Sequence, residues 1–201
     1  FITSSKLEGP NPSSDISGMI GQYAHGNEPS QHISYLYNFV GESWKTQQRV
    51  NQILKTFYNH TPEGLIGNED CGQMSAWYIF SALGFYPFNP ADQNYLIGSP
   101  LFDEATIYLG NGKQFVIKAN NPSDKNIYIK SAKLNGEDLT RSFITHKEIV
   151  NGGLLELEMS ETPNKNLWTN VESLPPSMSK NTSESEINKK EYAEQVKQEF
   201  V

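Results

Sequence analysis

The chain has 201 residues, which is enough for one ordinary domain or two small ones. Hydrophobic residues make up 36% and aromatic residues 11%, a composition typical of a packed core rather than of disorder. The net charge of -7 argues against a nucleic-acid partner, because phosphate binding needs clustered Lys and Arg side chains. No apolar run approaches the roughly 20 residues that a membrane span needs.

The chain starts at Phe1 rather than at Met, and no signal-peptide pattern follows. We therefore expect the start to be internal to a longer polypeptide, so localisation is not readable from this end. Cys71 is the only cysteine, which excludes an intrachain disulfide and leaves the redox compartment open.

Residues 1–90 carry helical patterns. Three helices are predicted, the first capped by Ser30 and ended by Gly41, the second capped by Ser43, and the third ended near Gly84. Their apolar positions recur at helical spacing, in the sets Ile33, Leu36, Tyr37, Val40; Val50, Ile53, Leu54, Phe57; and Met74, Trp77, Tyr78, Ser81. Successive buried helices of this kind fit an α/α arrangement.

Residues 91–170 change to a period of two. Apolar and polar residues alternate in 115–119 and 155–159, which predicts half-buried antiparallel strands. The run 110–112, Gly-Asn-Gly, is a hairpin signal. The predicted fold class is therefore α+β, with a small antiparallel β-sandwich or sheet layer. Residues 171–201 are rich in Ser, Lys, Glu and Asn, and predict a disordered tail with a weak helix at 189–200.

Glu69 and Asp70 lie in a glycine-flanked loop just before the third helix. Free N–H groups and the helix dipole favour negative charge there, so one acid fits a helix cap. The other interpretation is a carboxylate that activates a water molecule in a glycosidase cleft. Spacing alone leaves both open.

The second polar cluster is His25-Gly26-Asn27-Glu28, with His32 close behind it. Its carboxylate and amide are oxygen ligands of the kind that Ca²⁺ takes. It equally fits a helix-entry loop in which Glu28 is a local cap. Trp77 could stack on a sugar ring, although an aromatic residue at helical spacing is more often part of a core.

Long strings of this sequence resemble glycoside hydrolase family 92. They are ISGMIGQYAHGNEPS at 16–30 followed by QH at 31–32, WKTQ at 44–47, GNEDCGQMSAWYIFSALGFYP at 67–87 and YLIGSPLFD at 95–103. The resemblance covers about residues 10–168, with the same order and similar spacing.

The resemblance implies a calcium-dependent, inverting exo-α-mannosidase, often α-1,2-specific, that removes terminal mannose from N-glycan or mannan oligosaccharides. It implies an N-terminal β-sandwich and a C-terminal (α/α)₆ barrel with the active site between them. Residues 1–90 would be the last barrel helices, and 91–170 the terminal β layer. The parent protein would be secreted, periplasmic or on the cell surface of a bacterium.

Site roles also follow from the resemblance. Asp70 is expected to be the general base, Asn68 to assist it, and Glu69 to bind substrate or cap the helix. The expected calcium ligands are Asn27 and Glu28. The expected sugar contacts are His25, His32 and Trp77.

The family's general acid lies upstream of Phe1, so the isolated chain is expected to be inactive and to need the missing N-terminal part as its partner. Two other interpretations stay open. The chain could be a non-catalytic carbohydrate-binding or interaction module, or a degenerate remnant without a ligand.

Overall fold

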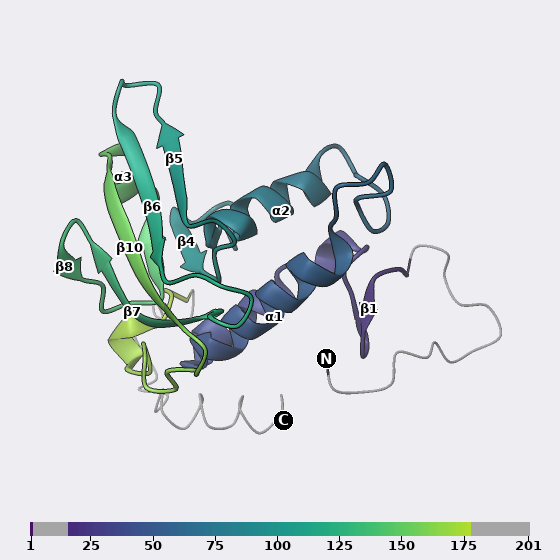
Figure 1. Ribbon diagram of the computed structural model, residues 1–201, viewed down its shortest axis with the longest axis horizontal. Coiled ribbons are helices and arrows are strands. Elements are labelled where there is room, and N and C mark those ends of the chain that lie inside the picture. The colour runs from purple at the N-terminus through teal and green to yellow at the C-terminus, as the bar shows by residue number, and fades with distance from the viewer. Residues whose placement is uncertain (2–15, 178–201) are drawn as a thin grey trace, which may run out of the picture.

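The computed structural model describes Phe1 and residues 16–177. It places α-helices beside β-sheets, as the α+β prediction required (Figure 1). The helical part contains α1 (Ser43–Phe57), α2 (Gln73–Leu83) and the 3-10 helices η1 (Glu28–Ser30) and η2 (Ile33–Val40). The (α/α)₆ barrel stays a prediction, because these few helices do not test whether a closed ring of helices forms.

The first predicted helix differs from expectation. Residues 33–40 form a 3-10 helix that follows His32, not Ser30, and Gly41 ends it with φ 72 as predicted. Because a 3-10 helix has about three residues per turn, it turns another set of residues inward. Its buried residues are Ser34, Tyr35 and Asn38.

The second and third helices match their predicted apolar faces. Val50, Ile53 and Leu54 of α1 are buried, and Gly84 ends α2 in the left-handed region. Ser43 is not the expected cap, because it is already the first helical residue and its buried hydroxyl has no hydrogen-bond partner.

The larger sheet has the strand order β5-β6-β10-β7-β8. Its strands are β5 (Glu104–Tyr108), β6 (Gln114–Asn120), β7 (Tyr128–Leu134), β8 (Glu137–Asp138) and β10 (Gly153–Ser160). The alternation in β6 and β10 is confirmed, since Phe115, Ile117, Leu155 and Leu157 are buried. The Gly-Asn-Gly run closes the β5–β6 hairpin, where Gly112 has φ 80.

One strand pair corrects the antiparallel prediction. β10 runs parallel to β6, with Leu155 opposite Ile117, while its other neighbour β7 is antiparallel. Alternation reports which residues face the core but not strand direction. The long connection between β6 and β10 permits the parallel pairing, since parallel strands cannot be joined by a tight hairpin.

Two smaller sheets complete the fold. One is the hairpin of β1 (Met19–Ile20) and β2 (Tyr23–Ala24), and the other has the order β3-β4-β9, from β3 (Phe85–Tyr86), β4 (Asn94–Ile97) and β9 (Phe143–Thr145). The short helix α3 (His146–Val150) connects β9 to β10. β3 lies within residues 1–90, so the β structure begins before the expected boundary at residue 91.

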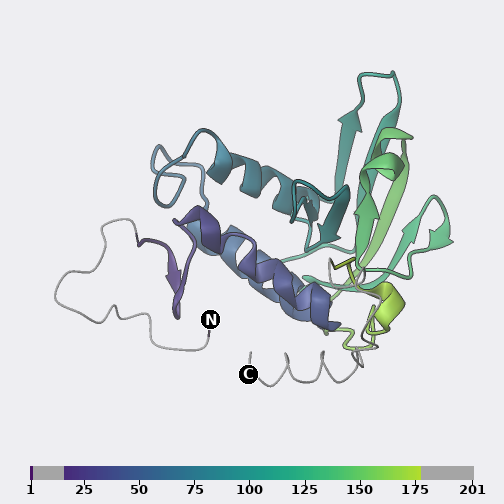
Figure 2. The ribbon, with the colours of Figure 1, turned by 180° about the vertical axis from the view of Figure 1, so that it is seen from behind.

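The helices, which lie beside the sheets in the ribbon seen from behind (Figure 2), are joined to them through buried polar contacts. The Gln47 side chain of α1 accepts a hydrogen bond from the Ile129 N–H of β7 at 3.0 Å. The Asn38 amide of η2 donates to the Ile97 carbonyl at 3.0 Å. Tying a helix to a strand backbone in this way fixes their relative position, because each buried partner would otherwise stay unsatisfied.

The expected tail begins later than predicted. Residues 171–177 belong to the described structure, with η3 at Val171–Ser173. The Ser173 carbonyl accepts hydrogen bonds from the N–H and the hydroxyl of Ser142. This pairing holds the segment against the β structure. The weak helix expected at 189–200, and the rest of the tail, lie outside the described residues.

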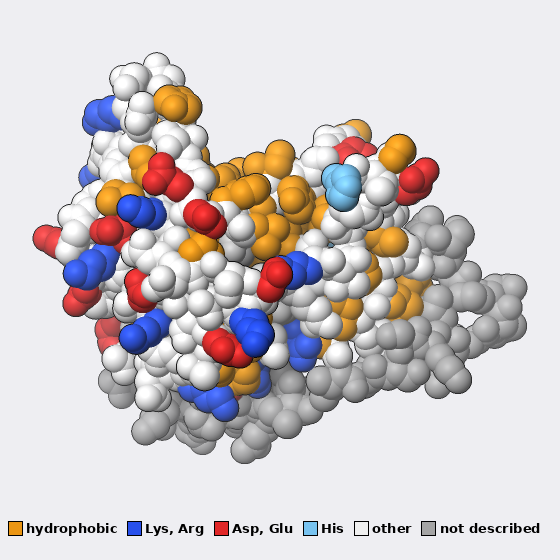
Figure 3. Space-filling model, in the orientation of Figure 1, with side chains coloured by type: hydrophobic (Ala, Val, Ile, Leu, Met, Phe, Trp, Pro, Cys, Tyr) orange, Lys and Arg blue, Asp and Glu red, His pale blue; other side chains and the backbone are white. Residues whose placement is uncertain are grey.

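Apolar side chains gather on the surface between α2 and the larger sheet (Figure 3). Ile79 of α2 is 56% exposed and Phe102, which precedes β5, is 48% exposed. An exposed apolar patch of this kind is typical of a surface that another part of a protein covers. Among the described residues, no helix is both long and apolar enough to cross a membrane.

Candidate active site

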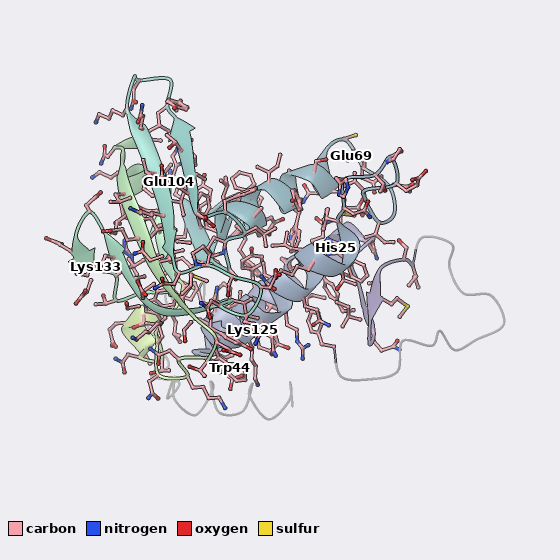
Figure 4. All side chains as sticks on the ribbon, viewed as in Figure 1. His25, Trp44, Glu69, Glu104, Lys125 and Lys133 are labelled. Carbon is pink, nitrogen blue, oxygen red and sulfur yellow. The ribbon has the colours of Figure 1, made fainter. Side chains whose placement is uncertain are left out.

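The two polar clusters that the sequence singled out lie next to each other in space. The backbone of Gly67 approaches that of Gly26 so closely that an added Cβ on Gly67 would lie 3.1 Å from the Gly26 Cα and carbonyl oxygen. A side chain at Gly67 would push the two segments apart, whereas one at Gly26 would collide with the Ser17 side chain. His25 and Glu69 therefore lie at the same end of the helical part, away from the sheet that carries Glu104 and Lys133 (Figure 4).

Glu28 and Asp70 form the carboxyl pair of this site. Their side chains are joined by a hydrogen bond, which is the main reason that the pKa of Glu28 lies below its ordinary value. The hydrogen bond favours the ionised form of Glu28, because a carboxylate accepts a hydrogen bond more strongly than the neutral acid does. The pair therefore belongs to two segments, η1 and the loop before α2, that are 42 positions apart in the sequence.

The backbone before α2 turns Asp70 outward. Asp70, Cys71 and Gly72 have φ angles of 48, 57 and 90 in succession. A left-handed conformation is uncommon for residues other than glycine, and such strain is concentrated at functional sites. Asp70 and Asn68 are both exposed, so a solvent molecule can reach the Asp70 carboxyl.

Glu69 caps α2. Its two carboxylate oxygens accept hydrogen bonds from the backbone N–H and the hydroxyl of Ser75, both at 2.9 Å, and its carbonyl accepts from the Met74 N–H. A carboxylate at a helix N-terminus is stabilised by the free N–H groups and the dipole. The capping interpretation therefore holds for Glu69, and its oxygens are occupied.

His25 is buried rather than open to a ligand. Its side chain has no exposed surface, and its two ring nitrogens lie 2.7 Å from the Tyr23 hydroxyl and 2.6 Å from the Tyr58 hydroxyl. The Trp77 ring packs against it at 4.4 Å between centroids. Burial lowers the pKa of His25 to about 4, so the imidazole is neutral at neutral pH.

Of the other two expected sugar contacts, Trp77 is buried and His32 is exposed. Trp77 is fully buried, and its indole N–H donates to the Gln31 carbonyl at 2.9 Å, so it belongs to the core. His32 is exposed and meets the Phe88 ring edge-on at 5.4 Å. Of the three, only His32 has polar atoms at the surface in this structure.

The site offers oxygen ligands of the type that calcium takes, but only a few of them. Glu28 and Asp70 offer carboxylate oxygens, and Asn27 is an exposed amide next in the chain to Glu28. Calcium takes about 6–8 oxygen ligands. Within residues 16–177, no group of three or more His, Cys, Asp or Glu side chains is placed to hold a metal ion. These residues could therefore supply only part of a calcium shell.

A surface cavity lies apart from this site. Its volume is about 460 Å³, and it is lined by Phe39, Phe88, Asn89, Asp92, Asn94, Leu96 and residues 175–177. None of the eight expected site residues lines it. The ring contact between His32 and Phe88 connects the two regions, and Leu96 of the cavity lies in the same hydrophobic cluster as Trp77.

Tyr58 and Gln31 are site neighbours that the sequence did not single out. Tyr58 contacts His25, and Gln31 is buried with its side-chain oxygen accepting from Gln73 at 3.1 Å. No spacing pattern in the sequence marks either residue, because Tyr58 lies 33 positions from His25 and Gln31 lies 42 positions from Gln73. Gln31 does fall next to the quoted string at 16–30, which is the one hint available.

Comparison with known proteins extends these observations. Residues 2–161 match the sequence model of the glycosyl hydrolase family 92 catalytic domain. An uncharacterized secreted glycosidase of Arthroderma benhamiae is 34% identical over 157 residues, which are 76% of this chain and 20% of that protein.

Solved structures agree with this match. A family GH92 α-mannosidase of Bacteroides thetaiotaomicron, in complex with mannoimidazole, is 43% identical, with a TM-score of 0.81 over 86% of this chain and 23% of that one. A family GH92 inverting mannosidase of the same organism is 46% identical, with a TM-score of 0.75 over 79% and 22%. The chain thus spans about a fifth of the length of these relatives. It belongs to glycosyl hydrolase family 92.

Proposed function

We propose that this chain carries the general-base side of the active site of an inverting exo-α-mannosidase, of α-1,2 specificity. The observation that carries the proposal is the meeting of Glu28 and Asp70 from two distant segments. Family membership supports the glycosidase chemistry, and the mannoimidazole complex of one similar structure supports a mannose-type ligand.

Asp70 is the proposed base. It lies exposed on a strained turn, within reach of solvent, whereas both Glu69 oxygens are held by Ser75. In an inverting reaction the ionised base takes a proton from the water that attacks the anomeric carbon, while an acid protonates the leaving oxygen. Asn68 would orient that water through its amide, without sharing the charge.

The acid is proposed to come from outside the described residues. Inverting glycosidases hold their two carboxyl groups about 6.5–9.5 Å apart, to leave room for the attacking water. Glu28 is hydrogen-bonded to Asp70 and is therefore too close. Glu69 is fixed on the helix end by Ser75 and is unsuited to protonate a leaving group. We therefore expect the isolated chain to lack hydrolytic activity.

Glu28 and Asn27 are the proposed calcium ligands. Bound Ca²⁺ would supply positive charge that favours the ionised form of both carboxyl groups, together with coordination positions for sugar hydroxyls. The remaining ligands would come from water, the sugar and the rest of a longer polypeptide. The hydrogen bond between Glu28 and Asp70 supports this assignment, because it gathers the oxygens of two carboxyl groups in one place.

His32 is the proposed direct sugar contact. His25 and Trp77 are proposed to support the site from beneath, because both are buried and their polar atoms already have partners. The proposed substrates are the terminal mannose residues of N-glycans or mannan oligosaccharides. The likeness to a secreted fungal glycosidase supports a secreted or cell-surface parent protein.

The test compares the complete polypeptide with the isolated chain on α-1,2-, α-1,3- and α-1,6-linked mannobiose, with Ca²⁺ and after its removal by a chelator. Proton NMR of early product would show β-mannose first if the anomeric centre is inverted. We expect calcium-dependent release of β-mannose, fastest from the α-1,2 substrate, by the complete polypeptide alone. Early α-mannose would refute inversion, and hydrolysis by the isolated chain would refute the missing acid.

A further inference from the structure

Three ring-bearing residues next to the segments that carry Glu28 and Asp70 form a chain of contacts, in which Tyr23 and His25 are buried and Tyr58 is half-buried. The chain runs from Tyr23 through His25 to Tyr58, with contacts of 2.7 and 2.6 Å. It continues from the Tyr58 hydroxyl to the Met74 sulfur at 3.0 Å and to the Met74 carbonyl at 3.4 Å. It therefore connects β2, the end of α1 and the first turn of α2.

The direction of the hydrogen bonds follows from the number of protons available. Burial keeps the His25 imidazole neutral, so one of its nitrogens donates and the other accepts. Tyr58 has one hydroxyl proton, and Met74 offers acceptors only. All contacts are satisfied together if Tyr23 donates to Nδ1 of His25, Nε2–H donates to the Tyr58 oxygen, and Tyr58 donates to Met74. The opposite tautomer would use the Tyr58 proton on His25 and leave the contacts between Tyr58 and Met74 without a proton.

We propose that Tyr58 is a positioning residue that holds the segment carrying Glu28 and the loop carrying Asp70 at a fixed separation. His25 lies three positions before Glu28, and Met74 lies four positions after Asp70. The Tyr58 hydroxyl contacts both, so it joins the two segments from the buried side while Gly26 and Gly67 join them through their backbones. The proposal rests on the proposed function only in assigning chemistry to the two carboxyl groups.

The Tyr58 ring is itself fixed, as a positioning role requires. It stacks on the Trp77 ring at 6.0 Å between centroids and 11° between planes, and lies 4.8 Å from the Tyr78 ring. Because the ring cannot shift far in this packing, loss of the hydroxyl would leave the contacts to His25 and Met74 unreplaced.

The test uses Tyr58→Phe, with Tyr35→Phe as the matched control. Tyr35 is buried, and its hydroxyl likewise makes a hydrogen bond, but to the Ser81 hydroxyl at 2.9 Å, away from the segments that carry Glu28 and Asp70. Hydrogen exchange is measured at the amides of residues 26, 73, 74 and 75, which donate to the carbonyls of Ser17, Asp70 and Glu69 and to the Glu69 side chain. Loss of one hydrogen bond predicts exchange about ten-fold faster there in Tyr58→Phe.

The control separates positioning from general destabilisation. Both variants should lower the melting temperature, but Tyr35→Phe should leave exchange at those four amides as in the wild type after correction for global stability. Equal effects in the two variants, or wild-type exchange in Tyr58→Phe, would overturn the proposal. If Tyr58→Phe does not fold, Met74→Leu decides: faster exchange at 73–75 supports the proposal, and unchanged exchange overturns it.

A second experiment measures kcat and KM of the same variants in the complete polypeptide. Tyr58→Phe should lower kcat about ten-fold with KM little changed, and Tyr35→Phe should leave both unchanged. A fall in KM alone, or equal falls in both variants, would contradict positioning. If the wild-type polypeptide does not hydrolyse mannosides, the proposed function fails, whereas the exchange data still decide the role of Tyr58.

Discussion

Lowering the pH from about 7 to about 5 should destabilise the folded chain by about 2 kcal/mol through His25 alone. The pKa of this residue is about 4 in the folded protein, because burial disfavours the charged ring, against 6.5 for the free side chain. Between these two values the unfolded chain binds a proton that the folded chain does not. The contribution of His25 to the free energy of unfolding is therefore fully present above about pH 6.5. It falls as the pH falls towards about 4, with a limiting loss of about 3 kcal/mol.

The assay is urea unfolding at steps across this pH range, with the free energy of unfolding as the readout. His25→Gln removes the titrating ring, so its unfolding free energy should change far less between about pH 6.5 and pH 5. His60→Gln is the matched control at an exposed histidine and should keep the wild-type slope. A wild-type protein equally stable at both ends of the range, or a His25→Gln variant with the same slope, would refute this reasoning.

Three further changes test the site and the surface. Gly67→Ala should lower the free energy of unfolding, measured by heat or urea, by at least about 1 kcal/mol more than Gly112→Ala. Both glycines have a positive φ, but of the two only Gly67 would bring its new Cβ within 3.1 Å of another backbone, so equal losses would contradict the close approach. Glu69→Ala should destabilise the fold by about 1 kcal/mol by removing the acceptor of the Ser75 N–H and hydroxyl, and no loss on calorimetry would argue against the cap. Ile79→Ser should reduce self-association of the isolated chain in sedimentation experiments, and unchanged association would exclude this exposed side chain as its cause.

The helix and strand patterns were readable from the sequence where they depend on local chemistry. Gly41 and Gly84 end helices because only a residue without Cβ adopts the left-handed conformation cheaply. The alternation around Ile117 and Leu157 indicated buried faces because side chains point to opposite faces of a strand. These signals depend on neighbours in the chain, which a sequence displays.

Features set by tertiary packing were not readable. The parallel pairing of β10 with β6 depends on where a long connection returns, and the 3-10 geometry of η2 depends on the surfaces it packs against. The pairing of Glu28 with Asp70 was not predicted, since no spacing rule links them and the family resemblance named each residue separately. Tyr58 was missed for the same reason, because its role comes from contacts made at a helix end.

The difference between local chemistry and tertiary packing also explains why the expected sugar contacts His25 and Trp77 are buried. Their residue types suit sugar binding, and the sequence could not tell an exposed ring from a buried one. The structure gives His25 two tyrosine partners and gives Trp77 a backbone partner, so packing rather than residue type decides what each can contact. A residue near a catalytic carboxyl can therefore support it without touching the substrate.

The measurement that tests the central claim most directly is the kinetics of Asp70→Asn in the complete polypeptide, with Asp138→Asn, an exposed change on the distant strand β8, as the control. A general base contributes about 10²–10⁴-fold to turnover. We predict that Asp70→Asn lowers kcat by about a thousand-fold and leaves KM within a few-fold of the wild type, while the control keeps both. An Asp70→Asn enzyme with near wild-type kcat, or one that loses substrate binding as severely as turnover, would contradict the assignment of Asp70 as the base.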